Sequence, residues 1–160
     1  FEKHSLDVKN LAKKGNVFTG NKDTNILCTL EIEDLVKKDY LTVESTQNLE
    51  NVADLLAHSD QVIFGVVNGE NDLQGLVYFN DIREVIFDNL KAENILVKDI
   101  MVQPIETADL FDSMETVMNK FEKSNKAFLP VLKNGKYYGF ITKSDVLESY
   151  RNRLKSMIFE

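Results

Sequence analysis

The sequence predicts a mixed α+β / α/β protein built from two pseudo-symmetric β-α-β-β-α repeats. The first observation is internal similarity. Apolar positions match at a constant spacing, as Val66 does with Val131, and beyond one deleted residue Asp81 matches Asp145. The second observation is an Asn-Gly dipeptide between two strand-like runs in each copy, which is a strong hairpin signal. Self-similarity of this kind indicates a duplicated supersecondary unit.

The first copy predicts five elements from its hydrophobic periodicity. They are a short strand at 40–44, an amphipathic helix Leu49–Ser59, strands Val62–Val67 and Leu73–Phe79, and a closing helix at about 80–90. Asn68-Gly69 lies between the two longer strands. Asn80 is expected to cap the closing helix, because a short polar side chain can accept from first-turn N–H groups.

The second copy predicts the same elements in the same order. They are a strand at 104–108, a helix Phe111–Ser124, strands Phe128–Leu132 and Tyr137–Thr142, and a closing helix from Ser144 to about 157. Asn134-Gly135 lies at the hairpin, and Ser144 is expected to cap the last helix.

One apolar stripe on the second-copy helix predicts a core. Its members recur at helical spacing and are Phe111, Met114, Val117, Met118 and Phe121. A unit of this size can hardly bury such a stripe alone, so the two copies are expected to pack back to back. The lone Cys28 is interpreted as a small buried hydrophobe.

The organisation expected along the chain is a lead-in at 1–29, a first repeat at 30–93 and a second repeat at 94–160. The first residue is Phe1 rather than Met, so we expect a piece of a longer protein. The stretch 31–39 is acidic and then basic. Its lysines Lys37 and Lys38 could help to bind phosphates, but the simpler interpretation is a solvated helix face.

Composition argues against several function classes. The net charge of −7 is opposite to that of a nucleic-acid binder. The longest apolar run, Val62–Val67, is far shorter than a bilayer span. His4 and His58 are distant from each other and lack metal-ligand spacing with Cys28. With no Walker-type phosphate loop either, the sequence predicts neither an enzyme nor a metal site.

The duplicated strand-to-helix junction concentrates groups that suit an anionic ligand. The second copy reads Gly139, Thr142, Ser144, Asp145, with the acidic residue in the first helical turn. A helix start attracts phosphate or carboxylate, and a carboxylate can accept from the two hydroxyls of a ribose diol. Gly139 permits close approach of a neighbouring strand or ligand.

A doubled unit with Gly-x-x-Thr-x-x-Asp before its last helix resembles a tandem CBS pair, or Bateman module, over roughly residues 30 to 155. The resemblance implies an adenine nucleotide (AMP, ADP or ATP) bound between the repeats, with no required cofactor. It implies that Asp145 holds the ribose, that Thr142 donates a hydroxyl and that Lys143 faces phosphates. The opposite wall implied by the family comprises Tyr40, Leu41, Thr42, Gln61, Val62 and Ile63.

The chain departs from the family pattern at three positions. Gln61 stands where some eukaryotic members stack an aromatic ring on adenine, and Gly65 stands where many repeats have proline. A missing ring forfeits about 1 kcal/mol of stacking. In copy one Tyr78 replaces the small hydroxyl residue, so Asp81 and Tyr78 form only a weak second site. We expect that cleft to be empty or filled by Tyr78.

A narrower likeness is to the cytoplasmic C-terminal region of prokaryotic CLC chloride channels and antiporters. It lies in "YLTVE", "NDIREVIFD", "VKDIM" and the lead-in "KHSLDVKNLAKKGNVFTGNKDTNIL". The resemblance implies a regulatory tail on the cytoplasmic face of the cell membrane, attached to a transmembrane CLC domain and forming a homodimer. Two alternatives stay open: a CBS pair from another transporter or enzyme, and a dimerisation module without a ligand.

Overall fold

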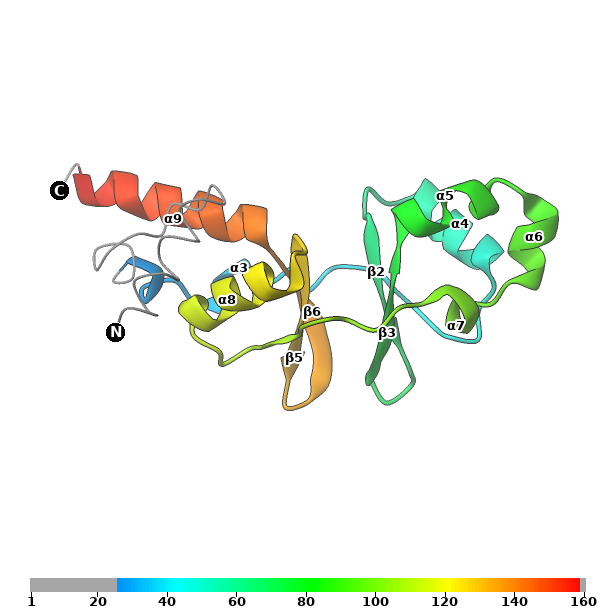
Figure 1. The fold of residues 1–160 in the computed structure, drawn as a ribbon, viewed down its shortest axis with the longest axis horizontal. Coiled ribbons are helices and arrows are strands. Elements are labelled where there is room, and N and C mark those ends of the chain that lie inside the picture. Colours follow the sequence, from blue (N-terminus) through cyan, green and yellow to red (C-terminus); the bar gives the residue numbers. More distant parts are fainter. Residues whose placement is uncertain (1–25, 159–160) are drawn as a thin grey trace.

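The computed structural model of the chain describes residues 26–158, and the expectations for 1–25 lie outside that range. Two three-stranded sheets stand side by side at the centre, each with its helices on the outer flank (Figure 1). The predicted α+β architecture of two β-α-β-β-α repeats is confirmed.

The first repeat contains β1 (Thr42–Val43), α4 (Leu49–Ala57), β2 (Ile63–Val67), β3 (Leu73–Tyr78) and α5 (Phe79–Ile86), and a short helix α3 (Ile32–Leu35) precedes it. β1 is parallel to β2, and β2 is antiparallel to β3. The strand order in this sheet is β1-β2-β3, and β3 and β2 lie alongside the second sheet (Figure 1).

The second repeat has the same plan. After α6 (Asn89–Asn94) and α7 (Val97–Ile100) it contains β4 (Ala108–Asp109), α8 (Met114–Ser124), β5 (Phe128–Lys133), β6 (Lys136–Thr142) and α9 (Lys143–Ile158). β4 is parallel to β5, and β5 is antiparallel to β6. The duplication read from the sequence is therefore a duplication of sheet topology.

Two boundaries predicted in the second copy are wrong. The strand expected at 104–108 lies at Ala108–Asp109, where parallel pairing with β5 fixes it. The helix expected from Phe111 begins three residues later, because Ser113 Oγ accepts a first-turn backbone N–H at 3.1 Å. Phe111 thus precedes the helix and is 75% exposed, outside the core. The other four members of the predicted stripe are buried.

The closing helix of the first copy is divided in two. The sequence predicts one helix at about 80–90, but α5 ends at Ile86. A new helix, α6, then starts after Asp88, whose side chain accepts from Lys91 N at 3.4 Å. A cap of this kind favours starting a helix over continuing one.

The two hairpins use different turns. Asn134 and Gly135 have φ of 53° and 80°, the left-handed pair that a two-residue type I′ turn requires. In the first hairpin Asn68 Oδ1 instead accepts from the backbone of Glu70 and Asp72 at 3.0 and 2.9 Å. Asn71 then takes the left-handed conformation with φ of 64°. The predicted hairpins are confirmed in both repeats, and only the second has the left-handed Asn-Gly pair of a type I′ turn.

The segments directly before β1 and β4, here called lead-in segments, are exchanged between the two sheets. Lys37, before the first repeat, pairs with Phe140 on β6, with N···O distances of 2.7 and 3.1 Å. Val102, before the second repeat, pairs with Leu76 on β3 at 2.8 and 2.9 Å. Each sheet is therefore extended by the chain that leads into the other repeat, and the pseudo-two-fold relation holds at the level of individual hydrogen bonds.

Glycines permit this exchange. A Cβ added to Gly139 would collide with the carbonyl group of Lys37 and would stand 3.0 Å from its carbon. A Cβ added to Gly75 would stand 2.9 Å from Met101 Sδ and 3.2 Å from the carbonyl oxygen of Val102. The predicted close approach at Gly139 is confirmed, and its partner is backbone.

The core follows the same exchange. One cluster combines α8 and the second sheet with Ile26, Ile32 and Val36, which precede β1. A second cluster combines the first sheet with Ala92 and Val97 from the connection. A third lies between the sheets and consists of Ile63, Val67, Leu76, Tyr137 and Phe140. Cys28, expected in the core, is exposed because the short helical turn that carries it directs its neighbours inward.

Candidate functional site

The strand-to-helix junction of the second repeat is capped by Thr142. Thr142 Oγ1 accepts from Asp145 N at 3.1 Å, and the residue is 7% exposed. Because α9 begins at Lys143, the predicted cap at Ser144 is wrong. In the first repeat Tyr78 occupies the cap position without a side-chain hydrogen bond, and Asn80 lies inside the helix. The Thr-to-Tyr difference thus removes a cap.

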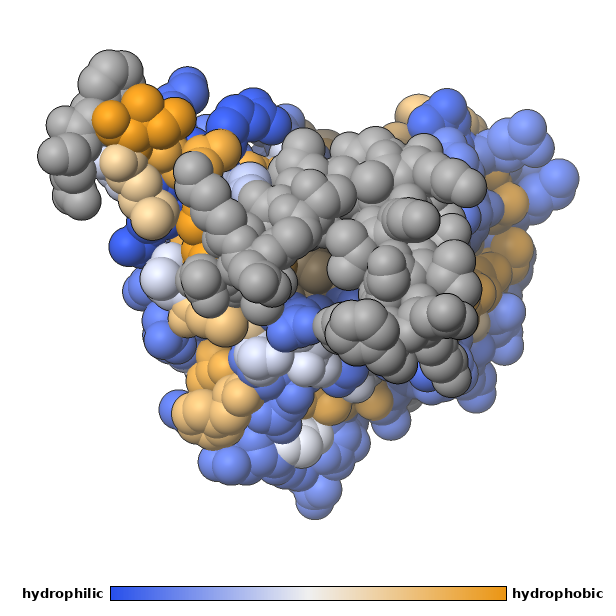
Figure 2. All heavy atoms as spheres, turned by 60° about the vertical axis from the view of Figure 1, so that its left-hand side comes forward, coloured by the Kyte–Doolittle hydropathy of each residue, from blue (hydrophilic) through white to orange (hydrophobic). Residues whose placement is uncertain are grey.

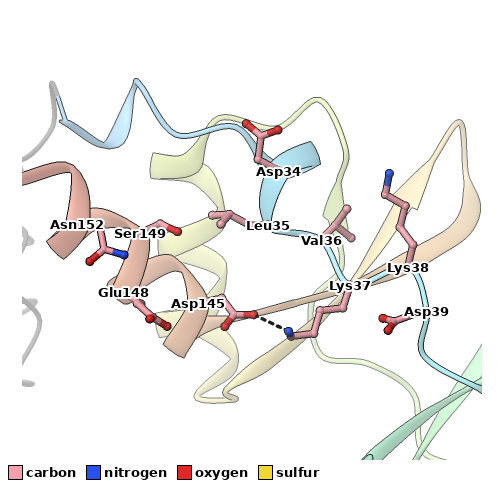
Figure 3. Close-up of a pocket in the computed structure, with 10 residues that line it drawn as sticks. All are labelled: Asp34, Leu35, Val36, Lys37, Lys38, Asp39, Asp145, Glu148, Ser149 and Asn152. Carbon is pink, nitrogen blue, oxygen red and sulfur yellow. Dashed lines mark ion pairs between the residues drawn. The ribbon is translucent and has the colours of Figure 1, made fainter. Parts of the chain in front are cut away.

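Asp145 is ion-paired with a residue from the other repeat's lead-in. Lys37 Nζ lies 3.3 Å from Asp145 Oδ2 (Figure 3). The charge pattern predicts a solvated Lys37, but the backbone pairing of Lys37 with Phe140 brings its side chain to the first turn of α9. Lys37 is the counterpart of Val102 in the duplicated spacing, and each of the two pairs with the sheet of the other repeat.

Tyr40 completes this group. Its ring packs against Phe140 with centroids 5.5 Å apart. Burial raises the pKa of the Tyr40 phenol; the charge of Lys37 opposes the rise, and Asp145 and Asp39 add to it. An aromatic ring and a lysine from the segment between α3 and β1 therefore meet a carboxylate from α9 at the border between the repeats.

Two hollows adjoin here, and together they are called the first cleft. One has a volume of about 570 Å³ and is lined by α3, the start of α9 and the segment between α3 and β1 (Figure 3). The other, of about 370 Å³, is lined by Tyr40, Leu41, Gln61 and neighbours of Gln61. Lys37 and Asp39 line both hollows. Asp145 lines the first hollow and Gln61 the second.

Gln61 is held by backbone. Its Oε1 accepts from Leu41 N at 2.8 Å, and its Nε2 donates to Leu41 O at 2.8 Å and to Ile63 O at 2.9 Å. Every strong hydrogen-bonding function of the carboxamide except one acceptor lone pair is in use.

The remaining predicted wall residues are dispersed. Thr42 lies in β1, opposite Gly65, and Ile63 is fully buried in the core between the sheets. Val62 is exposed but lines neither hollow. Lys143 Nζ lies 3.8 Å from Glu122 on α8, outside the lining of both hollows. The structure brings together Asp145, Tyr40, Leu41 and Gln61 from the predicted set.

A pseudo-equivalent second cleft lies on the Asp81 side. It is a hollow of about 350 Å³ lined by Tyr78, Asn80, Asp81, Val102, Gln103, Ile105 and Lys126. Lys126 Nζ stands 5.1 Å from the centre of the Tyr78 ring, and burial raises the pKa of that phenol. The expectation is a cleft that is empty or filled by Tyr78; in the structure the Tyr78 ring is part of the lining, beneath Lys126.

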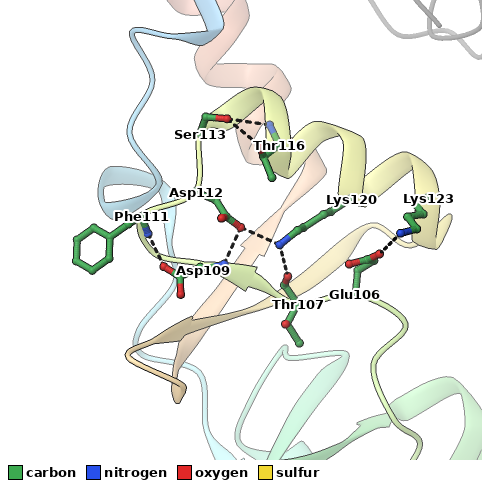
Figure 4. Close-up of polar contacts among 9 residues, drawn as sticks. All are labelled: Glu106, Thr107, Asp109, Phe111, Asp112, Ser113, Thr116, Lys120 and Lys123. Atoms are coloured by element: carbon green, nitrogen blue, oxygen red, sulfur yellow. Dashed lines mark hydrogen bonds and ion pairs between the residues drawn. The ribbon is translucent and has the colours of Figure 1, made fainter. Parts of the chain in front are cut away.

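The chain before α8 is fixed by charged groups. Lys120 Nζ reaches Asp112 Oδ2 and the carbonyl of Thr107, both at 2.8 Å (Figure 4). Asp112 also accepts from Asp109 N at 2.9 Å. Burial raises the pKa of the Asp112 carboxyl, but the Lys120 and Asp109 hydrogen bonds outweigh it and hold that pKa below its usual range. This network positions the segment from which Ile105 enters the second cleft.

Residues 26–158 contain neither a metal-binding cluster nor a membrane-spanning helix. That part of the chain contains no group of three or more acidic, His or Cys side chains placed to hold a metal ion. None of its helices combines the length and apolar character needed to span a bilayer.

The two repeats, their exchanged lead-ins and the two clefts define a duplicated α+β module with pseudo-equivalent sites. A model of the CBS domain matches residues 32–88 and 97–152. The chain therefore belongs to the CBS-domain family, as a tandem pair or Bateman module.

Three similar proteins place the chain in context. It is 26% identical over 116 residues to a homoserine O-acetyltransferase of Methanococcus vannielii, covering 72% of this chain and 24% of that protein. The chain thus spans about a quarter of the length of such relatives. The crystal structure of CbpB in complex with c-di-AMP superposes with a TM-score of 0.69 at 18% identity, covering 86% of this chain and 95% of that one.

The third is the cytosolic domain of the Mg²⁺ channel MgtE in complex with ATP. It superposes with a TM-score of 0.64 at 21% identity, covering 74% of this chain and 48% of that one. At these identities the two structural likenesses show the fold alone.

Proposed function

We propose that the chain is a non-enzymatic regulatory module that binds an adenine nucleotide (AMP, ADP or ATP) in the first cleft. The observation that carries the proposal is the meeting of Asp145, Lys37 and Tyr40, from both repeats, beside two adjoining hollows. The structures of CbpB and MgtE, which carry c-di-AMP and ATP, support the ligand class.

Each group has a chemical role in this proposal. The Asp145 carboxylate accepts from the ribose hydroxyls, and charge-assisted hydrogen bonds of this kind are the stronger ones. Lys37, released from Asp145 by that exchange, turns to the phosphates. The Thr142 hydroxyl still has its proton to donate, because its oxygen only accepts in the cap. Ligand binding therefore replaces an ion pair between the repeats.

Calorimetric titration with AMP, ADP and ATP tests this function. Asp145→Ala should weaken binding by about 2 kcal/mol, roughly thirtyfold, for the loss of hydrogen bonds to a charged group. The matched control is Asp81→Ala, the pseudo-symmetric residue, which should leave that affinity unchanged. No heat with any of the three nucleotides would favour the alternative, a dimerisation module without a ligand.

The host proposed for the module is a CLC-type chloride channel or antiporter, with the module on the cytoplasmic face of the cell membrane. The support is the likeness of "NDIREVIFD" and the lead-in to CLC tails. The acetyltransferase relatives favour a second candidate, a module attached to an enzyme. The gene sequence upstream of Phe1 discriminates the two: several apolar runs of about 20 residues support a transporter, and a catalytic α/β domain contradicts it.

A homodimer is the proposed assembly, and α4 and α5 of the first repeat offer a surface for it. A hollow of about 270 Å³ lies there, lined by Ala53, Leu56, Ala57, Phe79, Ile86 and Phe87. Phe87 is 79% exposed. In the second repeat Phe79 is matched by Lys143 and Ala57 by Glu122, and these two residues form an ion pair. The apolar surface is therefore specific to the first repeat. Exposed apolar patches of this kind mark interaction sites.

Analytical ultracentrifugation tests the assembly. The chain should sediment as a dimer, and Phe87→Glu should convert it to a monomer. The matched control is Phe111→Glu, an equally exposed ring on the second repeat. Figure 2 brings forward the opposite end of the molecule, which carries α9, and there apolar areas alternate with polar surface. Dissociation caused by Phe111→Glu and not by Phe87→Glu would overturn the assignment of the face.

A further inference from the structure

The Gln61 carboxamide reproduces the hydrogen-bonding edge of adenine. In the carboxamide an acceptor oxygen and a donor nitrogen flank one carbon. In adenine the acceptor N1 and the donor N6 also flank one carbon. Both groups are planar and meet a peptide with the same complementary pattern. Gln61 presents this edge to the N–H and the C=O of Leu41, both at 2.8 Å.

The same contact lies inside the first cleft. Leu41 and Gln61 both line the hollow of about 370 Å³, next to Tyr40 and Lys37. Gln61 Nε2 also donates to Ile63 O, so the carboxamide is held at three points. A purine that entered this hollow to pair with Leu41 would first have to displace the side chain.

The ribose end of the cleft is occupied in the same way. Lys37 Nζ lies 3.3 Å from Asp145, the carboxylate proposed to accept from the ribose. The chain's own side chains therefore engage both recognition groups. Gln61 pairs with the Leu41 backbone that would bind the base, and Lys37 pairs with the Asp145 carboxylate that would bind the sugar.

The second cleft lacks this device. The residue matching Gln61 in the repeat is Lys126, whose ammonium group has donors only and lies over the Tyr78 ring. An ammonium group cannot present the paired acceptor and donor of adenine. Only the first cleft is thus occupied by a side chain that resembles adenine, because only Gln61 carries a carboxamide at this position of the repeat.

We propose that Gln61 is an internal stand-in for the adenine edge, which keeps the first cleft self-occupied and sets its affinity for nucleotides. This inference rests on the proposed function, because it concerns regulation of the same cleft. When the binding-competent conformation is a minor one, the apparent affinity falls by the fraction of molecules in it. Removing the carboxamide makes the open conformation the major one, so the apparent affinity for the nucleotide rises.

Gln61→Met tests the inference in the full chain, because methionine keeps the length of the side chain and makes none of the three hydrogen bonds. Calorimetry should show AMP binding roughly tenfold tighter or more than to the unchanged chain. Lys126→Met is the matched control at the pseudo-equivalent position and should leave that affinity unchanged. If methionine perturbs the fold, Gln61→Glu gives a second variant that retains the acceptor for Leu41 N and loses both donated bonds.

A modified ligand separates the base edge from other effects. N6,N6-dimethyl-AMP lacks the donor hydrogens on N6, so Gln61→Met should not tighten its binding. The stand-in would be overturned if the Gln61→Met chain and the unchanged chain bound AMP with equal affinity. If Asp145→Ala then removed AMP binding from both chains, the proposed function would remain intact. No AMP, ADP or ATP binding to any variant would overturn the proposed function together with the stand-in.

Discussion

The exchange of lead-in segments predicts that Gly139 is the most sensitive glycine in the described part of the chain. In Gly139→Ala the new Cβ meets the Lys37 carbonyl and Val36 Cγ2, the latter at 3.0 Å. Because backbone cannot turn aside as a side chain can, Lys37 and Phe140 must separate. That weakens two hydrogen bonds of 2.7 and 3.1 Å.

The magnitude follows from these two contributions. Two hydrogen bonds contribute about 1 kcal/mol each, and overpacking costs about 1–3 kcal/mol. Gly139→Ala should therefore lower the free energy of unfolding by about 3 kcal/mol. Gly75→Ala meets chiefly the flexible Met101 side chain, so its cost should be about 1 kcal/mol. Gly69→Ala, with no atom within 4 Å of the new Cβ, is the matched control.

Urea unfolding followed by circular dichroism at 222 nm measures these differences, since the chain contains no tryptophan. The order of destabilisation should be Gly139→Ala, then Gly75→Ala, then Gly69→Ala. A Gly139→Ala chain within about 0.5 kcal/mol of the control would refute the account of the exchange, because surface substitutions typically stay within that limit.

Three further predictions concern single contacts. Tyr137→Phe should raise the free energy of unfolding by about 1 kcal/mol in urea, because the buried hydroxyl has no hydrogen-bond partner within residues 26–158; a loss of stability would reveal a partner. Lys120→Met should cost about 1.5 kcal/mol at pH 7. Since the folded-state pKa of Asp112 is lowered, the contribution of that pair is complete above about pH 4 and disappears as pH falls through the folded pKa. Unfolding measured from pH 7 to 3 should show the two chains converging, and a constant gap would contradict it. Lys136→Ala should cost less than about 1 kcal/mol, because its 2.6 Å pair with Asp72 is exposed; a cost undiminished in 1 M salt would contradict a screened surface pair.

Hydrophobic periodicity was sufficient to predict the duplicated fold. Matching positions such as Val66 and Val131 are both completely buried, since the same topology surrounds both. Boundaries were less predictable, because a local cap decides them. Ser113 starts α8 after the apolar pattern has already begun, and Asp88 starts a new helix where the pattern continues.

The site was predictable only in part, because its groups meet through tertiary pairing. Asp145 stands in a repeated motif that the sequence displays. Lys37 reaches Asp145 because the lead-in pairs with the other repeat, and local charge patterning carries no sign of that. Gly65, read as a departure from the family, is explained by packing: an added Cβ would stand 3.2 Å from the Tyr137 ring of the other repeat.

The central claim is that an adenine nucleotide binds between the repeats at the Asp145 side. The most direct measurement is a series of ¹H–¹⁵N correlation spectra of the full chain, recorded as AMP is added. The account predicts the largest shifts at Tyr40, Leu41 and Asp145, with the Gln61 side-chain amide signals moving in step. Shifts confined to residues around Asp81, or no shifts at saturating nucleotide, would contradict it.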